Sequence, residues 1–240
     1  MTRSKVVKSI AVGMLCLTAG AEPLYRCEMT VGGYAGTSTL TDFPLLVRIS
    51  PEKIDQFSYD DCAENGADIS FTDADSNVLP HEIDTWNPNG ESLVWVKLPS
   101  LSGKTTKFTF RWKDAAPPAN DPTRVWPGYV GVWHFNSYGE NGTPDSTSHG
   151  FTATNLSSWA WSSDTNPKNG SGALVGLFRA PDYEPMCNVG GTFSVSGWVY
   201  GPTYPTEGQW MSFGSKNVGT GAGGRSGFLI EVEGKATSII

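Results

Sequence analysis

The sequence predicts an all-β protein, in which a β-sandwich is followed by a second β-domain. Glycine (28 residues) and proline (16 residues) are abundant in the 240-residue chain, which is typical of a fold with many turns. Aromatic residues make up 12% of the chain, and several segments alternate apolar and polar residues as half-buried strands do. No long segment repeats apolar residues at helical spacing, so we expect little helix.

The first 21 residues have the pattern of a signal peptide. Arg3, Lys5 and Lys8 precede the short apolar run IAVGMLCLTAGA, whose last three residues, 19–21, are the small residues that a signal peptidase requires. The run is shorter than the roughly 20 apolar residues that span a bilayer, so an uncleaved anchor is the less favoured alternative. We expect an exported protein of the periplasm, cell surface or extracellular space, with no membrane insertion after cleavage.

Export changes both the charge and the cysteine chemistry that we expect. Residues 1–21 hold three basic and no acidic residues, so their removal takes the formal net charge from −7 to −10. Such an acidic chain is a poor partner for nucleic acid or anionic lipid. An oxidising compartment permits disulfides, and we predict a pair between Cys27 and Cys62, which fall in one predicted domain. Cys187 then remains as a buried thiol.

Strands are predicted throughout residues 22–115. In PLLVRIS and KFTFRW the apolar residues share one face and the polar residues the other. SLVWVKLP is apolar on both faces, which is typical of a strand in the middle of a sheet that is buried on both sides. The residues expected to face the core include Leu45, Val47, Ile49, Val94, Val96, Leu98, Phe108, Phe110 and Trp112.

A Pro-rich stretch divides the predicted domains. DAAPPANDPTRVWPG holds four prolines and no periodic pattern, so we place a semi-rigid linker at residues 116–127. After it, YVGVWHF, TFSVSGWVY and GFLIEVEG resume the strand pattern. The second predicted domain therefore covers residues 128–240.

Two groups of motifs resemble known families. The blocks NGADISFTDADSNVLPHEIDTW, SLVWVKLPSL and KFTFRWKDAAPP resemble the bacterial domain of unknown function 2341 over residues 40–115. The blocks VGVWHFN, PDSTSHGFTAT and FSVSGWVY are similar to the front part of a concanavalin A-like, laminin-G-like jelly roll. Such a jelly roll needs more strands than residues 128–240 supply, so we expect a fragment of a longer protein with further domains after residue 240.

Two acidic motifs invite a comparison with known sites. Asp73, Asp75 and Asn77 alternate as in the start of a calcium loop, but Val78 stands where that loop needs glycine. We therefore predict a polar hairpin turn and no cofactor, with calcium as the alternative. The pairs at 82/84 and 231/233 resemble the clustered acids of jelly-roll glucanases. Neither pair has the third acid, so we predict solvated strand faces.

The stretch GVWHFNSYGENGTPDSTSHG contains the residue types of a Ser/His/Asp site. His134 lies on the apolar face of its predicted strand, while Asp145 and Ser146 follow a turn. No regular element holds Ser146 against a base, so we interpret the stretch as a strand and loop in which Asp145 and Ser146 bond backbone amides and His149 precedes the next strand. The Gly-rich loop 219–224 precedes a strand rather than a helix, which argues against a nucleotide site.

Aromatic residues in polar, turn-rich segments are the preferred ligand-binding candidates. Trp159, Trp161, Tyr204 and Trp210 suit stacking on sugar rings, while covering a sheet edge or starting a buried strand is the structural alternative. The resemblance implies an exported, non-catalytic recognition module that binds carbohydrate or a cell-surface ligand, with a glycan or a cell-surface protein as partner. The alternatives are an accessory part of a glycoside hydrolase or lyase whose catalytic residues lie beyond residue 240, and an adhesion module that binds proteins.

Overall fold

The computed structural model confirms an all-β chain. It describes residues 25–103, 105–136, 142–155, 161–162, 173–174, 178–181, 194–197, 210–218 and 226–233. These residues form strands and short 3-10 helices, grouped in two compact units, Met1–Arg179 and Ala180–Ile240. The elements are β1 (Tyr25–Thr30), β2 (Leu40–Ile49), η1 (Tyr59–Asp61), η2 (Glu64–Gly66), β3 (Ser70–Thr72), β4 (His81–Thr85), β5 (Ser92–Leu101), β6 (Lys107–Trp112), η3 (Pro122–Val125), β7 (Thr154–Asn155), β8 (Trp161–Ser162), β9 (Ala173–Leu174), β10 (Phe178–Arg179), β11 (Trp210–Val218) and β12 (Ser226–Glu233).

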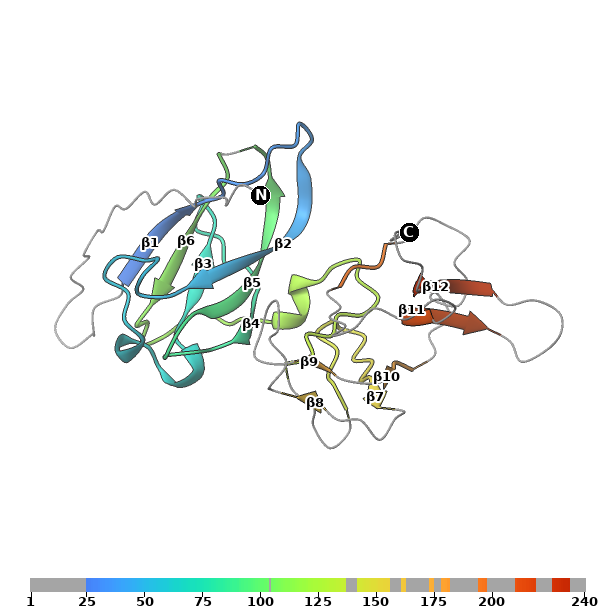
Figure 1. Ribbon diagram of the computed structural model, residues 1–240. Coiled ribbons are helices and arrows are strands. Elements are labelled where there is room, and N and C mark those ends of the chain that lie inside the picture. The colour runs from blue at the N-terminus through green and yellow to red at the C-terminus, as the bar shows by residue number, and fades with distance from the viewer. Residues whose placement is uncertain are drawn as a thin grey trace. The chain divides into compact units, whose positions relative to one another are not determined.

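Two antiparallel sheets form a β-sandwich in the first unit (Figure 1). One sheet has the strand order β1-β6-β3 and the other β2-β5-β4. Side chains from both sheets pack into a single core, where Phe71, Phe110 and Val96 are fully buried. The aromatic rings of this core lie close together, with the Phe71 and Phe110 centroids 5.2 Å apart. Burial of such large apolar side chains is the main source of stability for the sandwich.

The predicted central strands are confirmed. SLVWVKLP lies in β5, between β2 and β4, and Leu93 on its second face is 5% exposed. KFTFRW forms β6, which lies between β1 and β3. The inward residues predicted for these two strands are all buried: Val94, Val96, Leu98, Phe108, Phe110 and Trp112.

The predicted polar turn after β3 is also confirmed. The Asp73 carboxylate accepts hydrogen bonds from the backbone N–H groups of Asp75 and Asn77, at 3.0 and 2.8 Å. It also accepts one from the Asn77 side chain, at 2.9 Å. Asp73 therefore organises the turn that returns the chain toward β4.

The segment predicted as a linker packs onto the sandwich. η3 contacts β4 and β5, and Val125 and Trp126 are only 0% and 6% exposed. Proline restricts the backbone without preventing a segment from lying against a surface. The composition therefore predicted a segment without strands but not its packing on the sandwich. The two compact units of the structure meet at Arg179 and Ala180, and the predicted domain division at residues 116–127 stays a prediction.

Two asparagine side chains bond the outer edge of β4. The Asn120 amide accepts from the His81 backbone N–H at 3.1 Å and donates to the His81 carbonyl at 2.8 Å. The Asn136 amide donates to the Asp84 carbonyl at 2.7 Å. These amides supply the hydrogen bonds that a neighbouring strand would otherwise make, because β4 is the last strand of its sheet.

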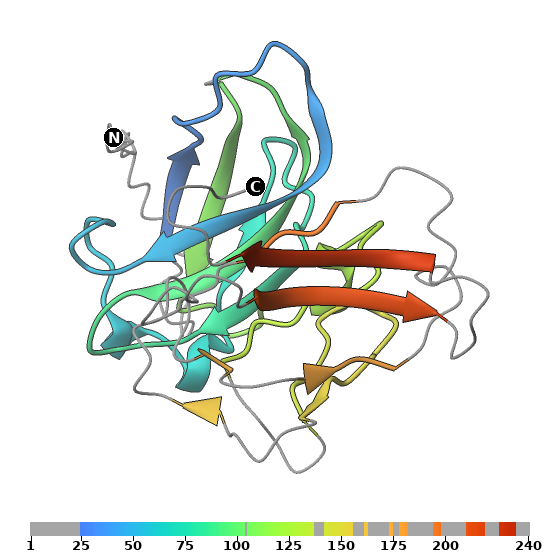
Figure 2. The ribbon, with the colours of Figure 1, turned by 45° about the vertical axis from the view of Figure 1, so that its right-hand side comes forward.

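The later strands form two-stranded antiparallel pairs: β7 with β10, β8 with β9, and β11 with β12. Figure 2 shows the β11–β12 pair, whose register shifts between Ser212 and Gly214. The predicted jelly roll over residues 128–240 stays a prediction. None of the helices among the described residues is long and apolar enough to cross a membrane.

The predicted Cys27–Cys62 disulfide is not formed. Both residues are present as thiols, and each sulfur contacts a backbone carbonyl, that of Glu28 for Cys27 and that of Ser58 for Cys62. Burial, assisted by the charges of Asp68 and Asp61, raises the pKa of Cys62 to about 12. Such a thiol stays protonated and is a poor nucleophile. Cys187 lies outside the described residues.

Candidate functional site

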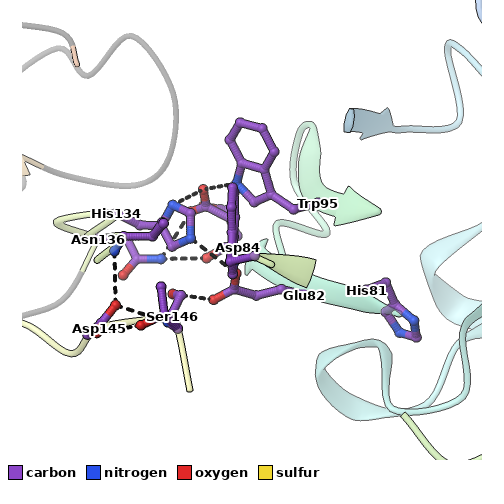
Figure 3. A network of polar contacts seen from close by, with 12 residues as sticks. His81, Glu82, Asp84, Trp95, His134, Asn136, Asp145 and Ser146 are labelled. Carbon is purple, nitrogen blue, oxygen red and sulfur yellow. Dashed lines mark hydrogen bonds and ion pairs between the residues drawn. The ribbon is translucent and has the colours of Figure 1, made fainter. Parts of the chain in front are cut away.

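Two acidic side chains project from the face of β4 that points away from the sandwich core. Glu82 and Asp84 are two residues apart in one strand and therefore share a face. A β-bulge between Ile83 and Thr85 leaves Asp84 without a partner residue on β5. His81, on the opposite face, points away from this acidic pair (Figure 3).

His134 lies between these two carboxylates (Figure 3). Its Nε2 atom is 3.2 Å from Oε2 of Glu82, and its Nδ1 atom is 3.2 Å from Oδ2 of Asp84. The side chains of His134, Glu82 and Asp84 are 12%, 16% and 3% exposed. A histidine with both ring nitrogens against carboxylates satisfies both contacts only as an imidazolium, which has two N–H donors.

Further donors surround each carboxylate. Glu82 accepts hydrogen bonds from the Ser146 hydroxyl at 2.5 Å and from the Trp126 indole N–H at 2.6 Å. Asp84 accepts from the Trp95 indole N–H and the Asn136 amide, both at 3.0 Å. Buried charges are stabilised when their acceptor sites are filled in this way. We call Glu82, Asp84, His134, Ser146, Asn136, Trp95 and Trp126 the charged network.

Two tryptophans flank the histidine ring. The Trp95 ring is stacked against His134 with centroids 6.0 Å apart, and the Trp126 ring lies 5.6 Å from it. The two indoles are themselves 5.1 Å apart. An imidazolium held against aromatic faces gains a cation–π attraction and is shielded from water.

The pKa of His134 reflects a competition. Burial, the largest influence, lowers the pKa because a charged ring is poorly solvated there. The hydrogen bond with Glu82 and the charges of Asp84 and Glu82 act in the opposite direction. The net result is a pKa raised above the ordinary histidine value of 6.5, which favours the imidazolium that the geometry requires.

Asp145 organises the loop that carries Ser146. Its carboxylate accepts from the backbone N–H groups of Val132, Thr147 and Phe151, at 2.9, 3.0 and 3.0 Å. The predicted role of Asp145 in bonding backbone amides is therefore confirmed. Ser146 was assigned the same role, but its hydroxyl donates to Glu82 instead.

The prediction of solvated carboxylates at 82 and 84 is wrong, because the side chains of Trp126, His134, Asn136 and Ser146 cover them. The prediction that His134 is a core residue with satisfied ring nitrogens is confirmed, although its partners were not foreseen. His149 is exposed and stacks on Phe151, with centroids 5.3 Å apart. The predicted strand at YVGVWHF is irregular backbone in the structure. The pattern that could have found the network is a same-face acid pair in one strand and a histidine in an apolar segment later in the chain.

Two of the four predicted ligand-binding aromatics, Trp161 and Trp210, lie in the described part of the chain. Trp159 and Tyr204 lie outside the described residues. The backbones of Trp161 and Trp210 lie in β8 and β11, where they pair with Leu174 and Glu233. Their role in binding stays a prediction.

A pocket of about 340 Å³ lies at the other face of β4. Its lining combines His81 and Ile83 of β4 with the proline-rich segment around Asn120. His81 is 5% exposed, its Nδ1 atom has no hydrogen-bond partner of good geometry, and its ring packs edge-on against Phe71 at 5.2 Å. Burial lowers the pKa of His81 to about 4, opposed only by the Leu79 carbonyl.

We predict that alkaline pH weakens the first unit through His134. The folded chain keeps the His134 proton at pH values where the unfolded chain, with a pKa near 6.5, has released it. The free energy of unfolding should therefore fall as pH rises from 6.5 through the raised folded pKa. Urea unfolding at several pH values measures this slope. His134→Gln should remove it, and an unchanged slope in that variant would refute the assignment.

Residues 65–164 match the family model Domain of unknown function (DUF2341). The match extends beyond the predicted range of 40–115 at its C-terminal end and contains the whole charged network. It covers less than half of the chain. No curated protein and no solved structure matches the chain significantly.

Proposed function

We propose that the chain is an exported, non-catalytic recognition module that binds carbohydrate or another cell-surface ligand. The N-terminal pattern of three basic residues, an apolar run and small residues supports export. The match to a domain family over residues 65–164 and the β-sandwich support a module that serves as a scaffold.

The arrangement of His134 and Ser146 is the observation that most supports a non-catalytic role. A Ser/His/Asp site needs one ring nitrogen of the histidine to accept the serine proton while the other donates to the acid. Here both ring nitrogens of His134 face carboxylates, and the Ser146 hydroxyl donates to Glu82. His134, as an imidazolium, has no lone pair with which to activate a nucleophile.

The charged network has a structural use that suits recognition. It joins β4 of the sandwich to His134 and Asn136, and through Ser146 to the loop of residues 142–151, by contacts that are more than fifty residues apart in sequence. Binding residues are often placed on loops that a rigid scaffold positions. A buried ion cluster with defined geometry fixes where such a loop lies.

The finer proposal concerns residues 128–240. We propose that they form part of a laminin-G-like jelly roll, in which Trp159, Trp161, Tyr204 and Trp210 stack on sugar rings. The motif order VWHF, DST and FSVSGWV supports this proposal. A face of aromatic rings with neighbouring Asn and Asp side chains is suited to a neutral sugar.

A glycan array with the full chain tests the function. We expect selective binding to a subset of glycans, and we expect the double variant Trp159→Ala, Trp161→Ala to lose at least about tenfold in affinity, since each lost stacking contact removes roughly 1 kcal/mol or more. Tyr129→Ala is the matched control, because Tyr129 is an aromatic residue of 42% exposure outside the proposed site. Binding to no glycan would refute carbohydrate recognition, and equal losses in both variants would refute the proposed residues.

The same samples test the absence of catalysis. We expect no product when the full chain is incubated with the bound glycans, and no change on Ser146→Ala. Hydrolysis that disappears in Ser146→Ala would show that the network is catalytic.

A further inference from the structure

The sheet β1-β6-β3 (Figure 1) carries two arginines at directly opposed positions of β1 and β6. In the antiparallel register Arg26 of β1 is directly opposite Arg111 of β6, and Arg111 is directly opposite Ser70 of β3. Their neighbours in each strand, such as Phe71 and Phe110, point into the core. Because side chains alternate between faces, Arg26, Arg111 and Ser70 form one row across the outer face, which we call the arginine row.

The two guanidinium groups have no acidic partner among the described residues. Other basic residues nearby are paired: Lys107 forms an ion pair with Glu28 at 2.7 Å, and Lys113 forms one with Asp61 at 2.9 Å. Like charges directly opposite on neighbouring strands are destabilising. Two like charges that lie close together without an opposite charge are often found at functional positions.

Two hydrogen-bonding atoms in the arginine row are buried without a partner. They are Nε of Arg111 and Oγ of Ser70, and the Ser70 residue is only 1% exposed. A buried donor without an acceptor costs free energy. Asp68 lies near this row, but its Oδ2 atom accepts from the backbone N–H of Lys113, and its Oδ1 atom forms no hydrogen bond. Among the residues that the structure describes, these two atoms of the row therefore make no hydrogen bond.

We propose that the arginine row binds the carboxylate groups of an acidic polysaccharide. A guanidinium presents a planar fork of donors that matches a carboxylate in bidentate geometry. An oxyanion here neutralises the opposed guanidinium charges and accepts hydrogen bonds from the guanidinium N–H groups that reach the surface. The proposal rests on the proposed carbohydrate recognition and adds a charged class of glycan and a second surface.

The acidity of the chain makes such a site selective. With a formal net charge of −7, the chain as a whole repels a polyanion. The outward charges of β1, β3 and β6 are instead three basic residues, Arg26, Lys107 and Arg111, and one acidic residue, Glu28. A polyanion is therefore directed to this face.

Calorimetric titration of the full chain with a tetramer of galacturonic acid tests the proposal. We expect binding at low salt, and a loss of about tenfold in affinity for Arg111→Gln, because a charge-assisted hydrogen-bond pair is removed. Arg26→Gln, at an exposed position, should give a similar loss and serves if Arg111→Gln does not fold. Lys107→Gln is the matched control: it removes the same charge from the same face, and we expect a change of less than about twofold.

The ligand has a matched control as well. The fully methyl-esterified tetramer keeps the sugar rings and lacks the carboxylate charges, so we expect it not to bind this row. Inorganic sulfate at matched ionic strength tests whether a free oxyanion is the ligand. We expect the tetramer to raise the melting temperature of the wild-type chain more than sulfate does, because the polymer is the proposed ligand.

Three results would overturn the inference: no binding of the tetramer, equal binding of its methyl ester, or equal losses for Arg111→Gln and Lys107→Gln. The failure of this inference and that of the proposed function are distinguishable. Binding of neutral glycans that needs Trp159 and Trp161 but not the arginines would preserve the function and refute the row. Binding of the tetramer that needs Arg111 but not the tryptophans would support the arginine row and refute the proposed aromatic residues.

Discussion

Replacing Glu82 by glutamine is expected to lower the free energy of unfolding of the first unit by about 3 kcal/mol, because it leaves a buried imidazolium with one carboxylate instead of two. The Glu82 carboxylate accepts from His134, Ser146 and Trp126, and its side chain is only 16% exposed. Glutamine offers a single acceptor oxygen and places an N–H₂ group against donors. Urea unfolding followed by tryptophan fluorescence measures the loss, since Trp95 and Trp126 belong to the network.

Glu91→Gln is the matched control for this change. Glu91 pairs with Arg48 and Lys53 at the surface, where its side chain is 28% exposed. The same chemical substitution should cost less than about 1 kcal/mol there, because water screens exposed pairs. Equal losses for the two variants would mean that the charged network contributes no more than a surface ion pair.

The Glu82 variant should also release the covering loop before the sandwich unfolds. The backbone N–H of Ser146 donates to the Val132 carbonyl, and that of Val132 donates to Asp145. Hydrogen exchange at the Ser146 and Val132 amides should therefore accelerate more than exchange at Phe110 in β6. If hydrogen exchange accelerated equally at all three amides, the substitution would act on global unfolding alone.

Acid is expected to destabilise the first unit through His81, by about 3 kcal/mol between pH 6.5 and pH 4. The unfolded chain binds a proton at His81 below its ordinary pKa of 6.5, whereas the folded chain binds it only near pH 4. The unfolded state therefore holds more protons in this window, and stability falls as pH falls. Urea unfolding at steps between pH 7 and pH 4 measures the slope.

His81→Leu isolates this contribution from the titration of carboxylates in the same range. The variant should lose most of the difference between pH 6.5 and pH 4 while keeping the packing against Phe71. His149→Leu is the control, because His149 is exposed and lies outside the charged network. If His149→Leu flattened the acid slope as much as His81→Leu, His81 would not be its source.

The two buried histidines affect the pH dependence of stability in opposite ways. They contact opposite faces of β4. His81 is buried beside apolar groups and resists protonation, while His134 is buried beside two carboxylates and holds its proton. The free energy of unfolding of the first unit should therefore be greatest near neutral pH, between the two slopes.

Strand alternation predicted the core but not the site. The alternation in β5 and β6 identified the inward residues because each strand has two faces and one of them must be buried. The same alternation placed Glu82 and Asp84 on one outward face, but it carries no information about what covers that face. His134 and Asn136 reach it from more than fifty residues later in the chain, and local patterns do not report such contacts.

The Pro-rich segment and the cysteines also differ from what composition suggested, for related reasons. Prolines around 117–122 predicted a linker, yet Val125 and Trp126 next to them anchor the segment on the sandwich. Cysteine count suggested a Cys27–Cys62 pair, but shared membership of a domain does not bring two sulfur atoms together. The proximity of Arg26 and Arg111 could not be predicted from the sequence, because only the register of β1 and β6 makes them neighbours.

The asparagine amides on β4 also affect how molecules of this chain meet one another. A bare outer strand is a template on which a strand from another molecule can pair, and this pairing begins many forms of aggregation. Asn120 occupies the outward N–H and carbonyl of His81, and Asn136 occupies the carbonyl of Asp84. These two side chains therefore protect the solubility of the sandwich at that edge, without adding a strand to it.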